Sequence, residues 1–176
     1  MASIIQNGKV NGSARVCERA IVSEDATVSG HAIVSDRAEV SGHATVCGHA
    51  LVRGHAWVKG FATVSGKATI SGDAIVSGHA WVRGDVKLCG TAKVCGMAVV
   101  SEQKHVDWAW FDARSGYYVL TLYMQADGSV GFTWGCRIGT DLRAYFNERP
   151  AYAVEGLDVE PLAFLLEFEQ ANNIAN

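Results

Sequence analysis

Two nearly identical hexads hold the side chains with the clearest capacity for chemistry. They cover residues 55–60, HAWVKG, and residues 79–84, HAWVRG. An indole that points to solvent can stack on a planar ring, while lysine, arginine and protonated histidine can pair with phosphate or carboxylate. The pattern therefore predicts a site for an anionic small molecule such as a nucleotide. Its candidate ligand-binding residues are Arg53, His55, Trp57, Lys59, His79, Trp81 and Arg83.

The same tryptophans have a second interpretation, as part of an apolar interface. Trp57 and Trp81 would then form one hydrophobic patch with Ile33, Leu51 and Ile75. Exposed patches of this size usually mark an interface, so a second copy of the chain or its own C-terminal region would cover it. The two interpretations are compatible, and both stay open at this point.

Other reactive side chains lack the partners that chemistry needs. His31 and His49 occupy equivalent repeat positions, but two imidazoles without a fixed carboxylate are too few ligands for a metal site. The five cysteines contain no C-x-x-C pair of the kind that binds zinc. Cys136 has no base beside it to activate it as a nucleophile. We therefore assign no catalytic residue, no metal ligand and no cofactor.

A strict repeat must position these side chains. An aliphatic residue recurs at every sixth position from Val10 to Val100, with alanine two residues before it and glycine two residues after it in most units. Residues two apart point to the same face of an extended segment, so each A-x-V unit predicts a short strand with one buried face. Apolar residues six apart form no stripe on an α-helix, which excludes that structure. Strands this short must stack on one another in parallel to bury that face.

The hexads resemble a known family. Residues 44–49, ATVCGH, and 74–79, AIVSGH, look like the hexapeptide repeat of left-handed parallel β-helices. The resemblance implies triangular coils of three hexads, about five of them here, and a homotrimer of the kind formed by acyltransferases and their non-catalytic relatives. On such coils Trp57 and Trp81, 24 residues apart, would lie on adjoining sides at neighbouring heights.

The resemblance also implies an enzymatic alternative, an acyltransferase that uses acetyl-coenzyme A. A histidine would then act as the general base on the acceptor hydroxyl or amine. The candidates are His43, His49, His55 and His79. Such enzymes generally extend a loop from the coils to build the acceptor site, whereas these hexads run without interruption. The unbroken repeat therefore favours a protein that is not an enzyme.

The period also sets the domain boundaries. We expect an N-terminal cap at residues 1–9, the repeat solenoid at 10–102, a linker at 103–107 and a C-terminal region at 108–176. The predicted fold is an all-β solenoid with a small α+β C-terminal region.

Turn and cap signals predict the elements of the last region. Residues 117–124 and 130–134 are typical of a β-hairpin. Thr140 fits the N-cap of a helix that ends at Pro150, and a last helix is expected over residues 160–171.

The segment that follows the hairpin carries a second resemblance. Residues 135–140, GCRIGT, look like the tail that follows hexapeptide repeats in some phage and prophage proteins. This likeness implies a phage-encoded protein that interferes with a bacterial host. We therefore expect a non-enzymatic homo-oligomer that binds an anionic small molecule, such as a nucleotide signal of host defence, or a host protein. A purely structural assembly protein is a third alternative.

Charge and composition limit the partners. The net charge of −3 argues against general binding to nucleic acid, although residues 1–101 carry ten Lys and Arg against seven Asp and Glu. Residues 102–176 carry five against eleven, so the solenoid is the part that favours an anion or the acidic tail. The opening residues lack the pattern of a signal peptide, and no stretch is long and apolar enough for a membrane. An odd number of cysteines without spacing for disulfides favours the cytoplasm.

Overall fold

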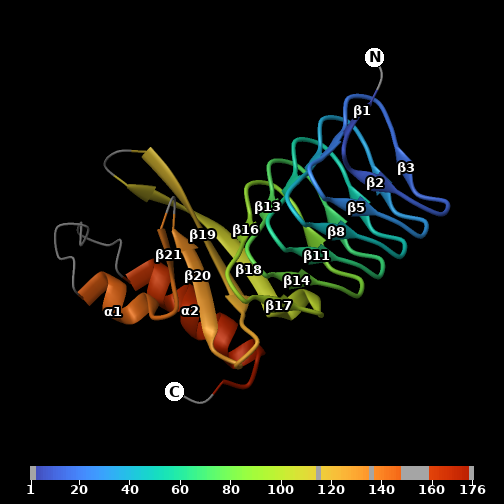
Figure 1. Cartoon of the computed structure of the whole chain (residues 1–176). Coiled ribbons are helices and arrows are strands. Elements are labelled where there is room, and N and C mark those ends of the chain that lie inside the picture. Colours follow the sequence, from blue (N-terminus) through green and yellow to red (C-terminus); the bar gives the residue numbers. More distant parts are fainter. Residues whose placement is uncertain (1–2, 114–115, 135–136, 148–158, 175–176) are drawn as a thin grey trace.

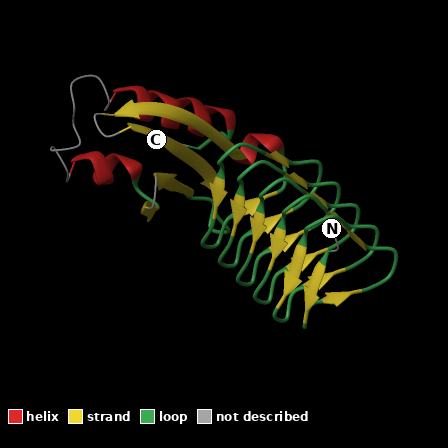
Figure 2. Ribbon diagram, turned by 90° about the horizontal axis from the view of Figure 1, so that it is seen from above, coloured by secondary structure: helices red, strands yellow, loops and turns green. Residues whose placement is uncertain are grey.

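The computed structural model describes residues 3–113, 116–134, 137–147 and 159–174. Residues 4–100 form seventeen short strands, which make three parallel sheets along the length of a solenoid (Figures 1 and 2). The chain passes through sheets A, B and C in turn and then returns to sheet A one coil further on.

The strands of each sheet are spaced at regular intervals along the sequence. Sheet A consists of β1 Ile4–Gln6, β4 Ile21–Ser23, β7 Glu39–Val40, β10 Trp57–Val58, β13 Ile75–Val76 and β16 Lys93–Val94. Sheet B consists of β2 Lys9–Val10, β5 Thr27–Val28, β8 Thr45–Val46, β11 Thr63–Val64, β14 Trp81–Val82 and β17 Val99–Val100. Sheet C consists of β3 Arg15–Val16, β6 Ile33–Val34, β9 Leu51–Val52, β12 Thr69–Ile70 and β15 Lys87–Leu88.

The register follows directly from the hexads. Trp57 pairs with Glu39 on one side and Ile75 on the other, so equivalent residues of successive coils are eighteen apart. Ala56 and Val58 are fully buried, while Trp57 between them is 44% exposed. This alternation places the alanines and valines in one continuous core. The predicted solenoid of about five parallel coils is thus confirmed, and its left-handed sense stays a prediction.

Glycine recurs at the corners because the coils approach closely there. Gly54 has a φ of +75°, and a Cβ atom on it would lie 2.9 Å from the amide nitrogen of Gly72 in the next coil. Glu18, Glu24 and Asp36 adopt the same left-handed conformation in the first coils. The Asp36 side chain stabilises its corner, because its Oδ2 accepts a 2.8 Å hydrogen bond from the Gly54 amide. An acid can therefore replace glycine where its carboxylate bonds to the next coil.

The first residues extend the solenoid where a separate cap was expected. β1 pairs in parallel with β4, and β2 pairs with β5, so these strands begin sheets A and B. The physical reason is that apolar Ile4 and Ile5 add a strand to the open edge of β4. Both side chains are half exposed, at 50% and 51%.

The C-terminal region contains a turn, an antiparallel sheet and two helices. The strand order of this sheet is β18-β19-β20-β21, and α2 contacts β18 and β19. The elements are η1 Gln103–His105, β18 Val106–Ala113, β19 Gly116–Met124, β20 Val130–Trp134, β21 Arg137–Gly139, α1 Leu142–Asn147 and α2 Val159–Ala171.

Most local predictions for this region hold, with two differences. The hairpin is confirmed as β19 and β20, and the last helix as α2. The residues expected as a linker, 103–107, form η1 and the start of β18, because Val106 pairs with Tyr123 of β19. The N-cap of α1 is Asp141 rather than Thr140, since the Asp141 carboxylate accepts a 2.8 Å hydrogen bond from the Ala144 amide. Pro150 lies outside the described residues.

This region closes the end of the solenoid. The Thr121 hydroxyl accepts a 3.1 Å hydrogen bond from the Lys93 amide of β16, and the Thr133 hydroxyl donates a 3.0 Å bond to the Lys93 carbonyl. The Gln103 side chain accepts a 2.8 Å bond from the Lys87 amide of β15. The last strands would otherwise present unpaired backbone groups. Figure 1 shows the sheet at this end and the N-terminus at the other.

No helix among the described residues has the length and apolar character needed to span a bilayer.

Candidate functional site

The outward side chains that could bind a ligand or take part in catalysis lie along the three edges of the solenoid. The A/B edge lies between sheets A and B, and the B/C and C/A edges are defined in the same way. The residues that follow the corner glycines, or the acids that replace them, form one file on each edge because the coils repeat every eighteen residues. The files are Asp25, His43, Phe61, His79 and Met97 on the A/B edge, Ser13, His31, His49, Lys67 and Asp85 on the B/C edge, and Arg19, Arg37, His55, Asp73 and Thr91 on the C/A edge.

The predicted site residues surround the coils instead of meeting at one point. Trp57 lies on sheet A, and Trp81 lies on sheet B between Thr63 and Val99, as the spacing of 24 residues predicts. Within the set, the Lys59 ammonium group lies 5.0 Å from the centre of the Trp57 ring. Arg53 and His55 lie at the C/A edge, Lys59 and His79 at the A/B edge, and Arg83 at the B/C edge.

The single apolar patch suggested by the sequence does not form. Ile33 and Leu51 are neighbours on sheet C, Trp57 and Ile75 on sheet A, and Trp81 lies on sheet B. The physical reason is the hexad spacing itself, because residues that differ by six or by twelve positions fall on different sides of the coil.

Exposed apolar side chains gather instead around the A/B edge. Phe61 and Met97 lie on this edge and are 54% and 55% exposed. Trp57 and Trp81, 44% and 53% exposed, lie on the two sheets that flank it. Sequence reasoning named both tryptophans but missed Phe61 and Met97 as their neighbours. The spacing of eighteen residues, which puts Phe61, His79 and Met97 in one file beside the tryptophans, could have identified them.

The rings on the A/B edge form a continuous stack. Phe61 lies between His43 and His79, with ring centroids 4.9 Å apart in both pairs and planes within 14° and 2° of parallel. The His43 Nδ1 lies 3.8 Å from the Asp25 carboxylate at the lower end of the stack. The stack therefore offers a ladder of ring edges with an anionic end, next to the cation of Lys59.

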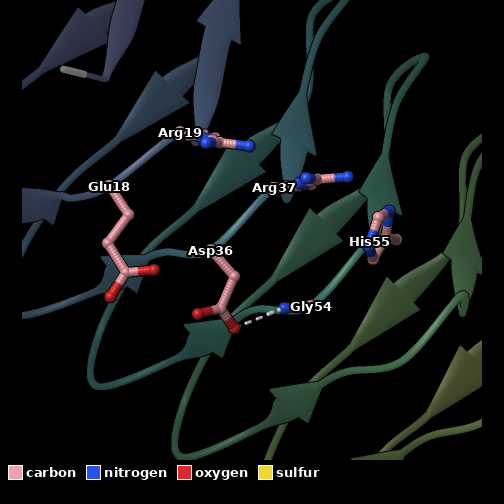
Figure 3. Close-up of a pocket in the computed structure, with 6 residues that line it drawn as sticks. All are labelled: Glu18, Arg19, Asp36, Arg37, Gly54 and His55. Carbon is pink, nitrogen blue, oxygen red and sulfur yellow. Dashed lines mark hydrogen bonds between the residues drawn. The ribbon is translucent and has the colours of Figure 1, made fainter. Parts of the chain in front are cut away.

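The C/A edge carries two arginines and a histidine in successive coils. Arg19, Arg37 and His55 occupy successive coils and line an open cavity of about 490 Å³ together with Glu18, Asp36 and Gly54. Figure 3 shows the two guanidinium groups projecting to one side of the cavity and the two carboxylates to another. Of these residues, sequence reasoning placed only His55 in a site, because the arginines carry no aromatic neighbour in the hexad.

The B/C edge holds the histidine pair considered as a metal site. The rings of His31 and His49 stack with centroids 4.9 Å apart and planes 8° from parallel, as the file predicts. Among the described residues, no group of three or more His, Cys, Asp or Glu side chains could hold a metal ion. The pair is explained by repetition of the hexad.

The general base that an acyltransferase needs has weak support. His43 is the solenoid histidine with an ion-pair distance to a carboxylate, and both side chains of that pair are more than half exposed, at 57% and 67%. The described coils from Arg15 to Val100 continue without an inserted loop. Cys136 lies outside the described residues. The enzymatic alternative stays a prediction.

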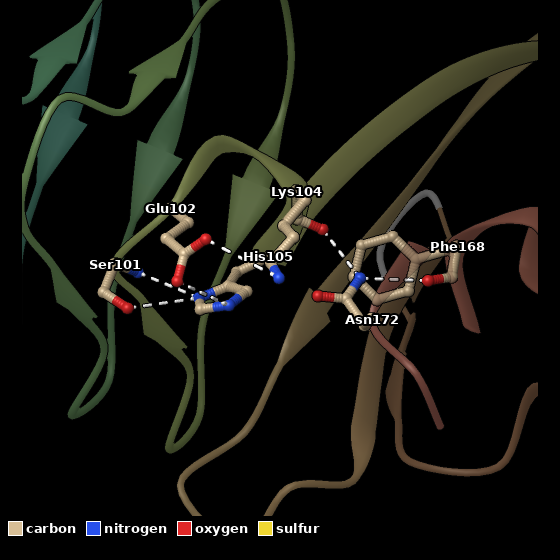
Figure 4. Close-up of polar contacts among 6 residues, drawn as sticks. All are labelled: Ser101, Glu102, Lys104, His105, Phe168 and Asn172. Carbon is tan, nitrogen blue, oxygen red and sulfur yellow. Dashed lines mark hydrogen bonds and ion pairs between the residues drawn. The ribbon is translucent and has the colours of Figure 1, made fainter. Parts of the chain in front are cut away.

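A polar joint connects the last coil to the C-terminal region (Figure 4). The Ser101 amide donates a 3.3 Å hydrogen bond to the Nδ1 of His105, and the Glu102 carboxylate lies 3.6 Å from the Lys104 ammonium group. The Asn172 side chain donates a 2.7 Å bond to the Lys104 carbonyl, which fastens the end of α2 to η1. The sequence held no signal for these contacts, and their role is to fix the closing sheet in place.

Two further polar pairs involve the C-terminal region, one buried and one half exposed. The Cys95 thiol lies 3.3 Å from the Tyr123 hydroxyl, and burial raises the pKa of both groups, so both are neutral at physiological pH. The Glu169 carboxylate, 8% exposed, accepts two hydrogen bonds of 2.8 and 2.7 Å from Arg143. The Cys95–Tyr123 pair joins the A/B corner of the last coil to β19, and the Arg143–Glu169 pair joins α1 to α2.

No protein-family model matches the chain, and no curated protein is similar to it. The likeness to hexapeptide-repeat proteins therefore stays a resemblance, and any function must be argued from the edges.

Proposed function

We propose that this protein is a non-enzymatic, homo-oligomeric binding protein that associates through its A/B edge. The observation that carries the proposal is the gathering of Trp57, Phe61, Trp81 and Met97 around that edge, each about half exposed. Scattered apolar side chains are ordinary on a protein surface, whereas a contiguous group of large ones marks an interface.

The apolar surface at the A/B edge is large enough to stabilise an oligomer. A large side chain buries roughly 200 Å² when fully covered, so the four residues leave roughly 400 Å² of apolar surface in water. Covering that area contributes roughly 10 kcal/mol per copy to the free energy of association, at about 25 cal/mol per Å² and before the entropic cost of association is subtracted. This gain is of the size needed to hold an oligomer together.

The placement of the residues supports a closed ring of copies. The two tryptophans lie on opposite flanks of one edge, so a copy presents different surfaces to its two neighbours, as in cyclic symmetry. Trp57 and Trp81 differ in height by one coil and a third, about 6 Å, which is close to the length of an indole. The ring systems of adjacent copies would therefore interdigitate. A homotrimer is the state that the resemblance to hexapeptide-repeat proteins implies.

The cations beside this edge support binding of an anionic small molecule with a planar ring. Lys59 lies over Trp57, so aromatic surface and positive charge occur together, and His79 stacks on Phe61 beside them. A nucleotide has both features. The phage-like segment at residues 135–140 supports the narrower proposal that the ligand is a nucleotide signal of host defence, or that the partner is a host protein.

The first experiment measures oligomeric state. The double variant Trp57→Ala/Trp81→Ala should elute as a monomer in size exclusion with light scattering, while the wild type should be trimeric. Ile33→Ala/Leu51→Ala is the matched control, because it removes the same kind of outward apolar side chain from sheet C. An unchanged oligomer in the tryptophan variant would overturn the role of the A/B edge.

The second experiment tests the ligand class. The melting temperature of the wild type is measured with nucleotides and with acetyl-coenzyme A, since a ligand that binds only the folded state raises it. We expect a rise with nucleotides that disappears in Trp57→Ala. Transfer of the acetyl group to any acceptor would contradict the non-enzymatic proposal.

A further inference from the structure

The C/A edge holds a row of two arginines and a histidine at a fixed spacing. The Arg19 amide donates a 2.8 Å hydrogen bond to the carbonyl of Asp36, and the Arg37 amide donates a 2.8 Å bond to that of Gly54. These bonds lock the backbones of Arg19, Arg37 and His55 one coil apart, about 4.8 Å. The geometry of the row is therefore set by the stacking of the coils.

The guanidinium groups of this row lie beside two acids but form no ion pair with them in the described structure. Within the part of the chain that the structure describes, neither arginine has an ion-pair partner. The adjacent acids Glu18 and Asp36 have φ angles of 59° and 61°, and Figure 3 shows their carboxylates directed away from the guanidinium groups. Asp36 is also held by its 2.8 Å bond from the Gly54 amide. The corner conformation itself thus separates the acids from the bases.

Two guanidinium groups one coil apart suit a particular shape of anion. One arginine can engage two oxygens of an anion in a fork, which uses both oxygens of a carboxylate. A phosphate or sulfate group has a further oxygen for the second arginine. Two like charges held this close repel each other, and a divalent anion between them removes that repulsion. The row thus favours a tetrahedral, doubly charged group over a carboxylate.

We propose that the cavity at the C/A edge binds the phosphate group of a small phosphate monoester, with Arg19 and Arg37 as the clamp and His55 as a third donor. The cavity of about 490 Å³ is open enough to admit the rest of such a molecule. Asp73 follows His55 in the file and ends the positive stretch, which confines the anion to the first coils. This site is separate from the A/B edge and does not depend on the proposed function.

Calorimetric titration with inorganic phosphate, inorganic sulfate and glycerol phosphate tests the site at one low ionic strength. The variants are Arg19→Gln and Arg37→Gln. Lys67→Gln is the matched control, because it removes a cation at the same repeat position on the B/C edge. We expect each arginine variant to weaken binding about ten-fold, the loss of one charge-assisted contact. The control should bind as the wild type does, with all variants melting at the same temperature.

The outcomes separate the sources of the phosphate group. Equal binding of inorganic phosphate and glycerol phosphate supports a site for the free anion, and tighter binding of the monoester supports recognition of the organic part as well. Absence of saturable binding, or equal weakening by Lys67→Gln, overturns the proposal. Trp57→Ala/Trp81→Ala should retain phosphate binding, so failure of the A/B edge and failure of this site are distinguishable.

Discussion

The closure of the solenoid by two threonine hydroxyls gives the sharpest test of how the chain is stabilised. Thr121 and Thr133 are 0% and 3% exposed, and their hydroxyls pair with the amide and the carbonyl of Lys93. Substitution of both by valine keeps the volume and the β propensity of each side chain. It removes these hydroxyl partners from one donor and one acceptor of the last strand of sheet A.

The expected loss follows from those two groups. Leaving a buried backbone donor or acceptor unsatisfied costs about 1–3 kcal/mol. The double variant Thr121→Val/Thr133→Val should therefore lose about 2–6 kcal/mol of unfolding free energy, a large part of the stability of a domain of this size. Each single variant should lose about half of that amount.

Urea unfolding followed by circular dichroism measures this loss. Thr91→Val is the matched control, because the Thr91 hydroxyl is buried and has no hydrogen-bond partner within the described structure. We expect that control to be as stable as the wild type or slightly more so, since it removes an unsatisfied group. A double variant within about 0.5 kcal/mol of the wild type would refute the idea that these hydroxyls close the sheet.

Four further outcomes test the corner, the buried thiol and the helix pair. Gly54→Ala should destabilise the protein by more than about 1 kcal/mol, measured by urea unfolding, because the position has a φ of +75° and no room toward the next coil. Burial raises the pKa of the Cys95 thiol, so in the native protein at pH 8 iodoacetamide should label the exposed Cys89 and leave Cys95 unmodified, as read by peptide mass spectrometry. The raised pKa also means that stability declines as pH rises above about 9, where the unfolded thiol releases its proton first. Glu169→Gln should lower the melting temperature, because it replaces the carboxylate that accepts both hydrogen bonds of Arg143 by a neutral amide. The double variant Glu169→Gln/Arg143→Met should recover part of the loss. Equal melting temperatures of the single and double variants would contradict this account.

The solenoid was predictable because its information is local and periodic. Each A-x-V unit specifies a strand and an inward face, and the glycine two residues later specifies a corner. The files follow from the same spacing, which is why the stack of His31 on His49 was expected before the structure. The pairing of β19 with β20 was predictable for the same reason, since a turn at residues 126–129 joins two strands of suitable residues.

The contacts that depend on where two segments meet were not predictable. Nothing in the sequence near Thr121 indicates that it lies beside Lys93, 28 residues earlier. The pairing of Val106 with Tyr123 turned an expected linker into a strand for a similar reason. The seven predicted ligand residues were chosen because two hexads have nearly the same sequence. A position in the hexad fixes only where a residue lies along one side of the coil, and it does not fix which of the three sides that is. The side itself is set by the count of hexads between them, which distributes five of the seven residues over the three edges and places the two tryptophans on sheets A and B.

The three edges differ in chemistry because outward residues are free of the core. An inward alanine or valine must fit the coils above and below it, whereas a residue after the glycine faces solvent and can change alone. The A/B edge has become aromatic, and the C/A edge has become cationic in its first coils. A ring of copies that closes around the A/B edges leaves every C/A edge on the outer side. Each copy would therefore keep its own phosphate clamp after assembly, so anion binding should have the same affinity in the oligomer and in a monomeric variant.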